Sequence, residues 1–334
     1  MKILGLASVA AALLAQLSGG AASAEPLTIR MQYASVSQFV ALIPHVPKEL
    51  YRHYGKSYVV EPNFMPGSGP ALTAFAAGEL ELAALNPQSL GNAVANAKLP
   101  VKALVSVLST DMPGHVRAAY YCHADRVKKV EDLRGKSIGI NALGSSPEAA
   151  ARAFLGRRGM QPGRDYQMVE MRFNVALAAL DAKKVDCAIL VPPWVNLVSE
   201  RKDLVPIFAP GDVFGPTETV FWAGRPDWIA ANRAALVDFA EDHIRMRHWC
   251  LDPKTHGQAV ALAAKIGKQP LAAFNYLWTD KDNYHEPNGL IDVARLQKNM
   301  DDLHKYGLVS AKVNAGEYTD TSIVREAMAR IQTN

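Results

Sequence analysis

Cysteine is scarce in this sequence. Its 334 residues include three cysteines, Cys122, Cys187 and Cys250, and none of them belongs to a C-x-x-C pair or to a Cys/His metal-binding spacing. This small, odd set excludes a disulfide-rich scaffold and allows at most one disulfide bond. Cys187 lies inside the apolar run 185–191, and Cys122 follows two tyrosines. We therefore expect the cysteines to be buried as small hydrophobic side chains.

The charge balance has no strong excess of either sign. The chain carries 36 Lys and Arg against 32 Asp and Glu, a formal net charge of +4. Nucleic-acid-binding proteins cluster Lys and Arg on one surface, whereas the densest basic stretches here, 126–129 and 183–184, lie beside acidic residues. We expect no nucleic-acid partner. The length is enough for roughly two domains of ~100–200 residues.

Motifs of catalysis and of cofactor binding are also missing. The segment Gly67-Ser68-Gly69 fits neither the phosphate-binding loop G-x-x-x-x-G-K-[ST] nor the nucleophile elbow G-x-S-x-G. The nine histidines are dispersed, and His243 and His248 are five residues apart, which is not the i, i+4 spacing of two zinc ligands on one helix face. We expect no metal, no cofactor and no enzymatic activity.

Long apolar runs are confined to the N-terminus. Lys2 precedes the apolar segment 3–17, and Ala22-Ser23-Ala24 has the pattern of a signal-peptide cleavage site. A transmembrane anchor is the alternative, but a span needs ~20 apolar residues, more than this segment has, and no such run follows it. We predict a signal peptide, residues 1–24, that is cleaved after Ala24 and releases an exported, periplasmic protein.

The rest of the chain alternates short apolar runs with Ala-rich segments of helical period, which is the pattern of an α/β fold. Several predicted strands end in a small polar loop that leads into a helix. The helix after residue 144 has two possible N-caps, Ser145 with Glu148 or Ser146 with Pro147. The predicted strands are 27–33, 59–64, 80–85, 136–141, 168–171 and 185–191, and the predicted helices are a stretch ending at residue 50, 71–77, one opening at 86–89, 149–157, 175–182, 227–248 and 293–306.

Several motifs occur in an order that resembles one known family. In chain order they are the small-residue loop 33–37 after the first strand, Ser-Gly-Pro-Ala-Leu at 68–72, Ala-Gly-Glu at 77–79, Val-Glu-Asp-Leu-Arg-Gly-Lys-Ser-Ile-Gly at 130–139, Gly-Ser-Ser at 144–146, and Val-Asp-Cys-Ala at 185–188. Together they resemble the periplasmic substrate-binding proteins of ABC importers. The nitrate/sulfonate/taurine branch, which includes binders of thiamine-precursor pyrimidines, is the most similar. The resemblance covers about residues 27–309.

The resemblance implies a two-lobed periplasmic-binding-protein type II fold of the α/β class, with mixed, mainly parallel sheets and two crossings between the lobes. Lobe 1 would contain residues 25–116 and 217–334, and lobe 2 residues 117–216. Loop-rich segments at 111–114 and 210–216 agree with crossings at these places. By this resemblance the lobes close on a solute about a hinge, and the solute passes to an ABC permease in the inner membrane. We expect a monomer that binds without catalysis.

Loops that lead into helices form the expected ligand site. In open α/β sheets a ligand binds beyond the carboxyl ends of the strands, and helix N-termini favour anions. For any single serine, the alternative is that its hydroxyl only caps its own helix. Several convergent loops together favour an oxyanion. The candidate residues in these loops are Ser35, Ser37, Gln38, Ser68, Gly69, Asn86, Ser145 and Ser146.

Arg172 is the candidate cation of the site. It follows the predicted strand 168–171 and can present its guanidinium group to an acidic ligand. The alternatives are a solvated side chain or an ion pair with Glu170 or Asp181. Asn174 belongs to the same loop and is included among the candidates.

Two further residues indicate the class of ligand. Trp194 follows two prolines at a strand end and is a candidate pocket wall, with lobe packing as the alternative. Glu218, at the return crossing, is a candidate acceptor for an amino or ring N–H group, or else a hinge carboxylate in solvent. The set favours an organic sulfonate or carboxylate, including aromatic acids. The alternatives are nitrate, a thiamine-precursor-like pyrimidine held by Glu218, and an exported enzyme of the same fold.

Overall fold

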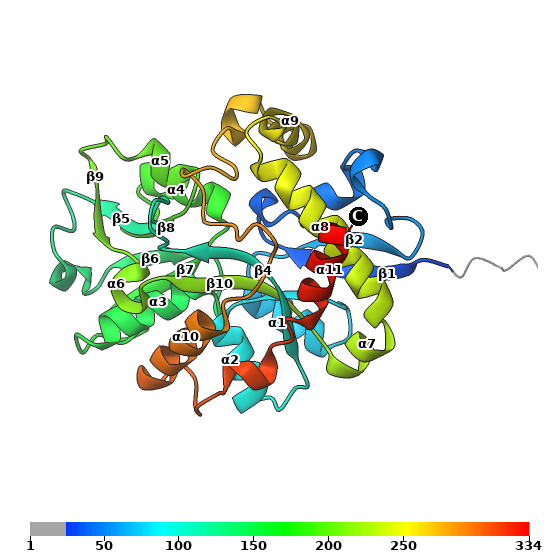
Figure 1. Ribbon diagram of the computed structural model, residues 1–334. Coiled ribbons are helices and arrows are strands. Elements are labelled where there is room, and N and C mark those ends of the chain that lie inside the picture. The colour runs from blue at the N-terminus through cyan, green and yellow to red at the C-terminus, as the bar shows by residue number, and fades with distance from the viewer. Residues whose placement is uncertain (1–24, 334) are drawn as a thin grey trace, which may run out of the picture.

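The computed structural model describes residues 25–333, and the strands fall into two groups (Figure 1). The predicted signal peptide lies outside the described residues. The first group combines N-terminal strands with one strand from much later in the chain. β1 and β2 pair with each other, β10 lies between β3 and β4, and a bridge between Met31 and Leu82 links the two sheets. The members are β1 (Leu27–Tyr33), β2 (Tyr58–Phe64), β3 (Ala83–Leu85), β4 (Lys102–Thr110) and β10 (Thr217–Gly224).

The second group is one five-stranded sheet of order β7-β6-β8-β5-β9, which lies entirely within residues 119–208. We propose that the two groups are the centres of the two lobes predicted above, and the names lobe 1 (25–116 and 217–334) and lobe 2 (117–216) are used in this sense. The strands of lobe 2 are β5 (Ala119–His123), β6 (Ser137–Ile140), β7 (Gln167–Glu170), β8 (Cys187–Leu190) and β9 (Leu204–Phe208).

The sheets are mixed, but parallel pairs do not dominate as expected. Within residues 25–333, three strand pairs are parallel and four are antiparallel. The crossings between the sheets explain the difference. β4 leads out of lobe 1 where β10 leads back into it, and β5 enters lobe 2 where β9 leaves it. Each of these neighbouring pairs therefore runs antiparallel.

Four helices each follow a strand and begin at a small polar loop. They are α1 (Ser68–Ala76) after β2, α2 (Pro87–Ala95) after β3, α3 (Ser146–Gly156) after β6 and α4 (Phe173–Asp181) after β7. The side chain of Asn86 caps α2 by accepting a hydrogen bond from the Ser89 N–H at 2.7 Å. Ser145 Oγ caps α3 by accepting from the Glu148 N–H at 3.3 Å. Ser145 is thus the N-cap of the two that the sequence allowed.

The segment before residue 50 is not the predicted helix. It forms three short 3-10 helices, η1 (Val36–Gln38), η2 (Val40–His45) and η3 (Lys48–Leu50). Pro44 and Pro47 lack an amide hydrogen and cannot continue an α-helical ladder. Phe39, between η1 and η2, has φ +68°, and its buried ring stacks on Trp278 with 5.6 Å between the centroids.

The C-terminal third packs mainly on lobe 1 (Figure 1). The predicted helix 227–248 is split at Asn232, whose φ of −116° and ψ of 18° are not helical. The helix predicted at 293–306 is confirmed as α10. Within residues 25–333, none of the helices combines the length and apolar character required to cross a bilayer. The helices are α7 (Pro226–Ala231), α8 (Arg233–Leu251), α9 (His256–Gly267), α10 (Val293–Lys305) and α11 (Ser322–Thr333), with short α5 (Trp194–Leu197) and α6 (Gly211–Phe214) in lobe 2.

Hydrophobic side chains fill the space between the sheets and their covering helices. One buried cluster extends from α1, α2 and α10 into β5, β6 and α3, and so joins the two lobes. A second cluster lies beneath α8, α9 and α11, and a third lies beneath α4. Within the first, the rings of Tyr120 and Phe154 each stack on Phe208 at 4.3 Å. The helices are thereby fixed on the sheets, and the strand-to-helix loops are left at the sheet edges.

Two of the three cysteines are bonded, so the expectation of simple packing was wrong for them. Cys122 in β5 and Cys187 in β8 are register partners and form a disulfide bond, whereas Cys250 is buried and free. The partners are 65 residues apart in sequence, and only the antiparallel register brings them together. A disulfide bond is typical of an oxidising compartment, which agrees with the predicted export.

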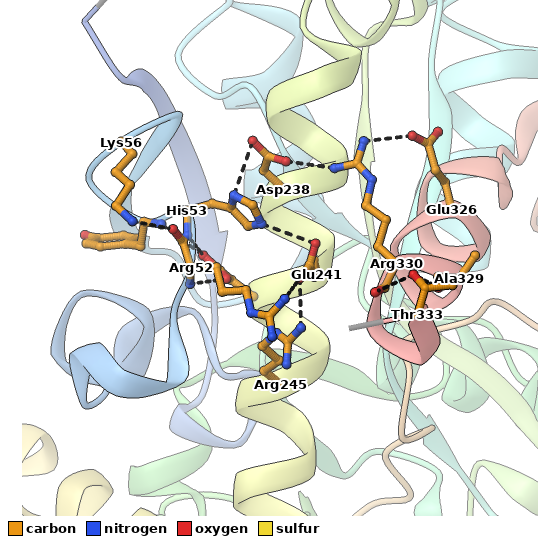
Figure 2. Close-up of polar contacts among 12 residues, drawn as sticks. Arg52, His53, Lys56, Asp238, Glu241, Arg245, Glu326, Ala329, Arg330 and Thr333 are labelled. Atoms are coloured by element: carbon orange, nitrogen blue, oxygen red, sulfur yellow. Dashed lines mark hydrogen bonds and ion pairs between the residues drawn. The ribbon is translucent and has the colours of Figure 1, made fainter. Parts of the chain in front are cut away.

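Asp242, a buried carboxylate on α8, holds the loop 51–58 against that helix. Asp242 accepts hydrogen bonds from the N–H groups of residues 52, 53 and 54 at 2.8, 3.0 and 2.9 Å, and from the Tyr58 hydroxyl at 3.1 Å. These hydrogen bonds explain why Asp242 is buried on a helix that was predicted as amphipathic. Figure 2 shows further ionisable residues on this helix and its neighbours, where Arg52 and His53 of the loop and Arg330 of α11 contact carboxylates of α8: Arg52, His53, Asp238, Glu241, Arg245, Glu326 and Arg330.

Candidate functional site

A cavity of about 510 Å³ lies between the lobes. Its walls are the loops that follow β1, β2 and β3 in lobe 1 and β6, β7 and β8 in lobe 2, together with the end of α9 and the segment 269–283. This is the position expected of a ligand site in an open α/β sheet, beyond the carboxyl ends of the strands. A cavity of this size accommodates a small organic molecule.

Four helix N-termini open onto the cavity. α1 and α2 come from lobe 1, α3 and α4 come from lobe 2, and capping or first-turn residues of each line the wall. The first N–H groups of a helix have no acceptor within it, and the helix dipole adds partial positive charge there. Among residues 25–333, the N–H groups of Ser68, Ser146 and Asn174 have no hydrogen-bond acceptor. The cavity therefore offers backbone donors from both lobes to an anion.

Hydrogen bonds within the loop after β1 fix its conformation. Gln38 Oε1 accepts a hydrogen bond from the Ala34 N–H at 2.8 Å, and the hydroxyls of Ser35 and Ser37 are 2.8 Å apart. Behind the loop, the indole N–H of Trp278 donates to the carbonyl of Ser37 at 3.3 Å. Gln38 therefore shapes the loop, whereas the serine hydroxyl that accepts from the other keeps its own hydrogen for a ligand.

The capping alternative holds for two predicted ligand residues. Asn86 is 1% exposed, and besides capping α2 it donates from Nδ2 to the Gly144 carbonyl across the lobes at 3.0 Å. The hydroxyl of Ser145 accepts the capping hydrogen bond of α3. Both side chains line the cavity, but their present contacts are structural.

Arg172 is the cation on the cavity wall. Its guanidinium carbon lies 5.2 Å from the centre of the ring of Phe64, a lobe 1 residue that also lines the cavity, which is an attractive cation–π contact. The predicted alternative partners are engaged elsewhere, since Glu170 accepts from the Leu143 N–H and Asp181 pairs with Arg201. Arg172 forms no ion pair with a carboxylate of residues 25–333, and its charge is available to a ligand.

Asp111 is the acidic residue of the described cavity wall, but its carboxylate is already paired. Arg117 Nε donates to it at 2.7 Å, and the same guanidinium reaches Asp212 at 2.9 Å, which ties the two crossings together. Burial raises the pKa of Asp111, although hydrogen bonding to Arg117 opposes the shift. The charge left for a ligand is therefore positive.

Apolar side chains form much of the remaining wall. Trp194, at the start of α5, lines the cavity and also packs on the buried cluster of lobe 2, so both interpretations made from the sequence apply. Ile266 and Phe274 contribute from the α9 region, and Tyr33 contacts Phe64 edge-on at 5.7 Å between ring centres. The wall suits a ligand with an apolar body as well as an anionic group.

The structure brings ten of the twelve predicted residues to the cavity wall. It also adds polar residues that the sequence reasoning missed, among them Gln32, Thr110, Asn141, Thr219, Tyr276 and Asn283. Gln32 near the end of β1 and Asn141 just after β6 carried a usable signal, because each is a polar residue at the carboxyl end of an apolar strand. The ten are Ser35, Ser37, Gln38, Ser68, Asn86, Ser145, Ser146, Arg172, Asn174 and Trp194.

Glu218 does not line the cavity and is not in solvent, so both expectations for it were wrong. It is 1% exposed inside lobe 1, where the Ser106 hydroxyl donates to it and Arg295 lies at 3.3 Å. Burial raises the pKa of Glu218 to about 7. The next two residues of β10, Thr219 and Val220, line the cavity, whereas the side chain of Glu218 points into lobe 1.

Gly69 does not line the cavity either. A methyl group in place of its α-hydrogen would lie 2.1 Å from the carbonyl oxygen of Leu143 in lobe 2. The backbone of Gly69 thus contacts the opposite lobe, where the sequence predicted contact with a ligand.

Comparison with known proteins assigns the chain to a family. The model of the NMT1-like family matches residues 22–264, which is more than half of the chain. The chain belongs to the NMT1-like family. No curated protein matches the sequence.

Solved structures similar to this NMT1-like chain have the fold of periplasmic binding proteins, as the resemblance implied. The alkanesulfonate-binding protein SsuA from Xanthomonas axonopodis pv. citri, bound to MOPS, is 15% identical with a TM-score of 0.66 over 90% of this chain and 100% of that chain. The aliphatic sulphonate binding protein SsuA from Escherichia coli is 19% identical, with a TM-score of 0.60 over 88% and 97% of the two chains. The nitrate-binding protein NrtA from Synechocystis PCC 6803 is 14% identical, with a TM-score of 0.68 over 93% and 90%.

These similarities show the fold of this NMT1-like protein. The three neighbours are named as binding proteins and not as enzymes. Within residues 25–333, no group of three His, Cys, Asp or Glu side chains is placed to hold a metal ion.

Proposed function

We propose that this protein is an exported solute-binding protein of an ABC importer. It captures a small organic anion, a sulfonate or carboxylate including aromatic acids, between its lobes and delivers it to a permease in the inner membrane. It acts in the periplasm after cleavage behind Ala24, as a monomer, without a cofactor and without catalysing a reaction.

The observation that carries the proposal is the convergence of four helix N-termini and Arg172 on one cavity between the lobes. These groups favour negative charge, and the apolar wall around Trp194 favours an organic body. Family membership and the fold of the neighbours agree with a binding protein.

The two alternative ligands receive less support from the cavity. A single nitrate ion would fill a small part of about 510 Å³ and would leave the apolar wall without a partner. The pyrimidine alternative depended on Glu218 as the hydrogen-bond acceptor, and Glu218 lies inside lobe 1. An organic anion uses both the charged and the apolar parts of the wall.

A thermal-shift screen of residues 25–334 tests the proposal. The panel contains alkanesulfonates, benzenesulfonate, benzoate, nitrate, aminopyrimidines and amino acids, and each organic acid is matched by its neutral amide. A true ligand at a hundredfold above its Kd stabilises the protein by about 2.7 kcal/mol. We expect stabilisation by at least one organic acid and none by its amide.

Stabilisation by nitrate or by neutral compounds alone would contradict the organic-anion proposal. Chemical conversion of a bound compound, detected by chromatography of the incubated mixture, would contradict a purely binding role. The signal-peptide part is tested separately by N-terminal sequencing of protein recovered from the periplasm, which we expect to begin at Glu25.

A further inference from the structure

The two lobes touch directly at one edge of the cavity. The loop entering α1 and the start of α2 meet the loop entering α3, and the contact is made by hydrogen bonds. The carbonyl of Gly144 accepts from Asn86 Nδ2 at 3.0 Å and from Ser89 Oγ at 3.1 Å. Asn141 Nδ2 donates to the carbonyl of Pro66 at 2.8 Å. This contact of residues 66–69, Asn86 and Ser89 with residues 141–145 is called the seam.

At the seam, backbone packs on backbone. A methyl group on residue 69 would lie 2.1 Å from the Leu143 carbonyl oxygen, and one on Gly144 would lie 3.2 Å from the Cα of Gly69. An ordinary van der Waals contact begins at 3.4 Å. A backbone contact has no rotamers through which it could adapt, so it limits how closely the two loops approach.

We propose that Gly69 is the closing stop of the two lobes and thereby sets the size of solute that the closed cavity accepts. With glycine at residue 69, the seam closes until the backbones meet. With any side chain there, the lobes stop at least about 1 Å earlier. The distance from the Cβ of residue 69 to the Leu143 carbonyl oxygen must then increase from 2.1 Å to 3.4 Å. The part that concerns solute size rests on the proposed binding function, whereas the stop itself is a property of the lobes.

Gly69→Ala tests the stop without adding backbone strain, because alanine can adopt the backbone conformation at residue 69. Gly69 is the second residue of α1 and is not among the glycines with positive φ, so alanine favours the helix. Gly144 has φ +73°, and alanine there would add backbone strain to any effect on closure. Gly156→Ala in α3 is the matched control, because it makes the same change in a helix with no neighbouring atom within 4 Å.

The distance between the lobes can be measured without any solute. Spin labels on Ala76→Cys, at the end of α1, and on Arg158→Cys, two residues beyond the end of α3, report the separation of the two lobes, and both positions are exposed. Cys250 is buried, which raises the pKa of its thiol and keeps it unreactive, and the other two cysteines are bonded. In pulsed electron paramagnetic resonance, we expect a longer mean distance in Gly69→Ala than in the wild type or Gly156→Ala. Coinciding distance distributions in all three proteins would overturn the stop.

The solute-size claim is tested with straight-chain alkanesulfonates from methanesulfonate to octanesulfonate. We expect Gly69→Ala to weaken binding of the shortest bound member by roughly tenfold or more, because the lobes no longer close tightly around it, and to weaken longer members less, because they fill the wider cavity. Gly156→Ala should leave every Kd unchanged. An equal loss at all chain lengths would overturn the size claim. If no alkanesulfonate binds the wild type, the sulfonate part of the proposed function fails, and the spin-label distances still decide whether Gly69 is a stop.

Discussion

Reduction of the bond between Cys122 and Cys187 is expected to lower the free energy of unfolding by about 4 kcal/mol. The bond closes a loop between residues 65 apart, and in the chain-entropy model a loop of that length removes roughly 14 cal/mol/K of entropy from the unfolded chain. Both cysteines are fully buried in the sheet of lobe 2, so a reductant reaches them only after unfolding. Comparison of oxidised and reduced protein leaves the sequence unchanged and avoids the cavity that a substitution would create.

The protein is first fully unfolded with or without a phosphine reductant and is then refolded. Equilibrium unfolding of both samples in urea is the assay. We expect the reduced protein to unfold at a clearly lower urea concentration with a similar slope. Alkylation in denaturant before reduction should modify one thiol, that of Cys250, and reduction should expose two more. Three alkylated thiols in protein isolated from an oxidising compartment, or equal urea midpoints for the two forms, would refute the reasoning.

Three further predictions concern single charged residues. Arg172→Gln is expected to weaken binding of an organic anion by about 2–5 kcal/mol in calorimetry, whereas Arg158→Gln, which removes another exposed arginine that lies over a phenylalanine ring, should leave it unchanged. The pKa of Glu218 is raised to about 7 in the folded protein, so its stabilising contribution is complete below pH 4.5 and is lost as the pH rises through 7. The free energy of unfolding of the wild type should therefore fall by on the order of 3 kcal/mol between pH 4.5 and pH 7, and that of Glu218→Gln should not. Parallel plots of stability against pH for the two proteins would contradict this. Asp242→Asn should lower stability by about 3 kcal/mol in urea unfolding because an amide nitrogen would face backbone donors, and a cost no larger than that of Asp238→Asn would argue against the role of Asp242 in holding the loop 51–58.

Elements with local signals were predictable from the sequence. The bounds of β1 coincide with the alternating run 27–33, the start of α2 follows from Asn86 before a proline, and the start of α3 was predicted to within one residue, with Ser145 or Ser146 as its N-cap. Because each of these loops ends a strand and opens a helix, most of the candidate site could also be predicted. The positions of its residues on one cavity wall then followed from the fold class.

Features that depend on contacts distant in sequence were not predictable in this way. The pairing of Cys122 with Cys187 needs the register of β5 and β8, and the inward direction of Glu218 needs the register of β10. Gly69 was a candidate ligand residue because it belongs to a loop that leads into a helix, but its backbone contacts the carbonyl of Leu143. That contact joins residues more than 70 positions apart, so the local sequence carries no signal for it.

The most direct test of the central claim is a calorimetric titration of residues 25–334 with the organic acid that stabilises the protein most, and with its neutral amide. The proposed site predicts saturable binding of the acid at one site per chain, no measurable binding of the amide, and loss of most of the affinity in Arg172→Gln. Equal binding of acid and amide, or undiminished affinity in Arg172→Gln, would contradict the claim that helix N-termini and Arg172 hold an anion between the lobes.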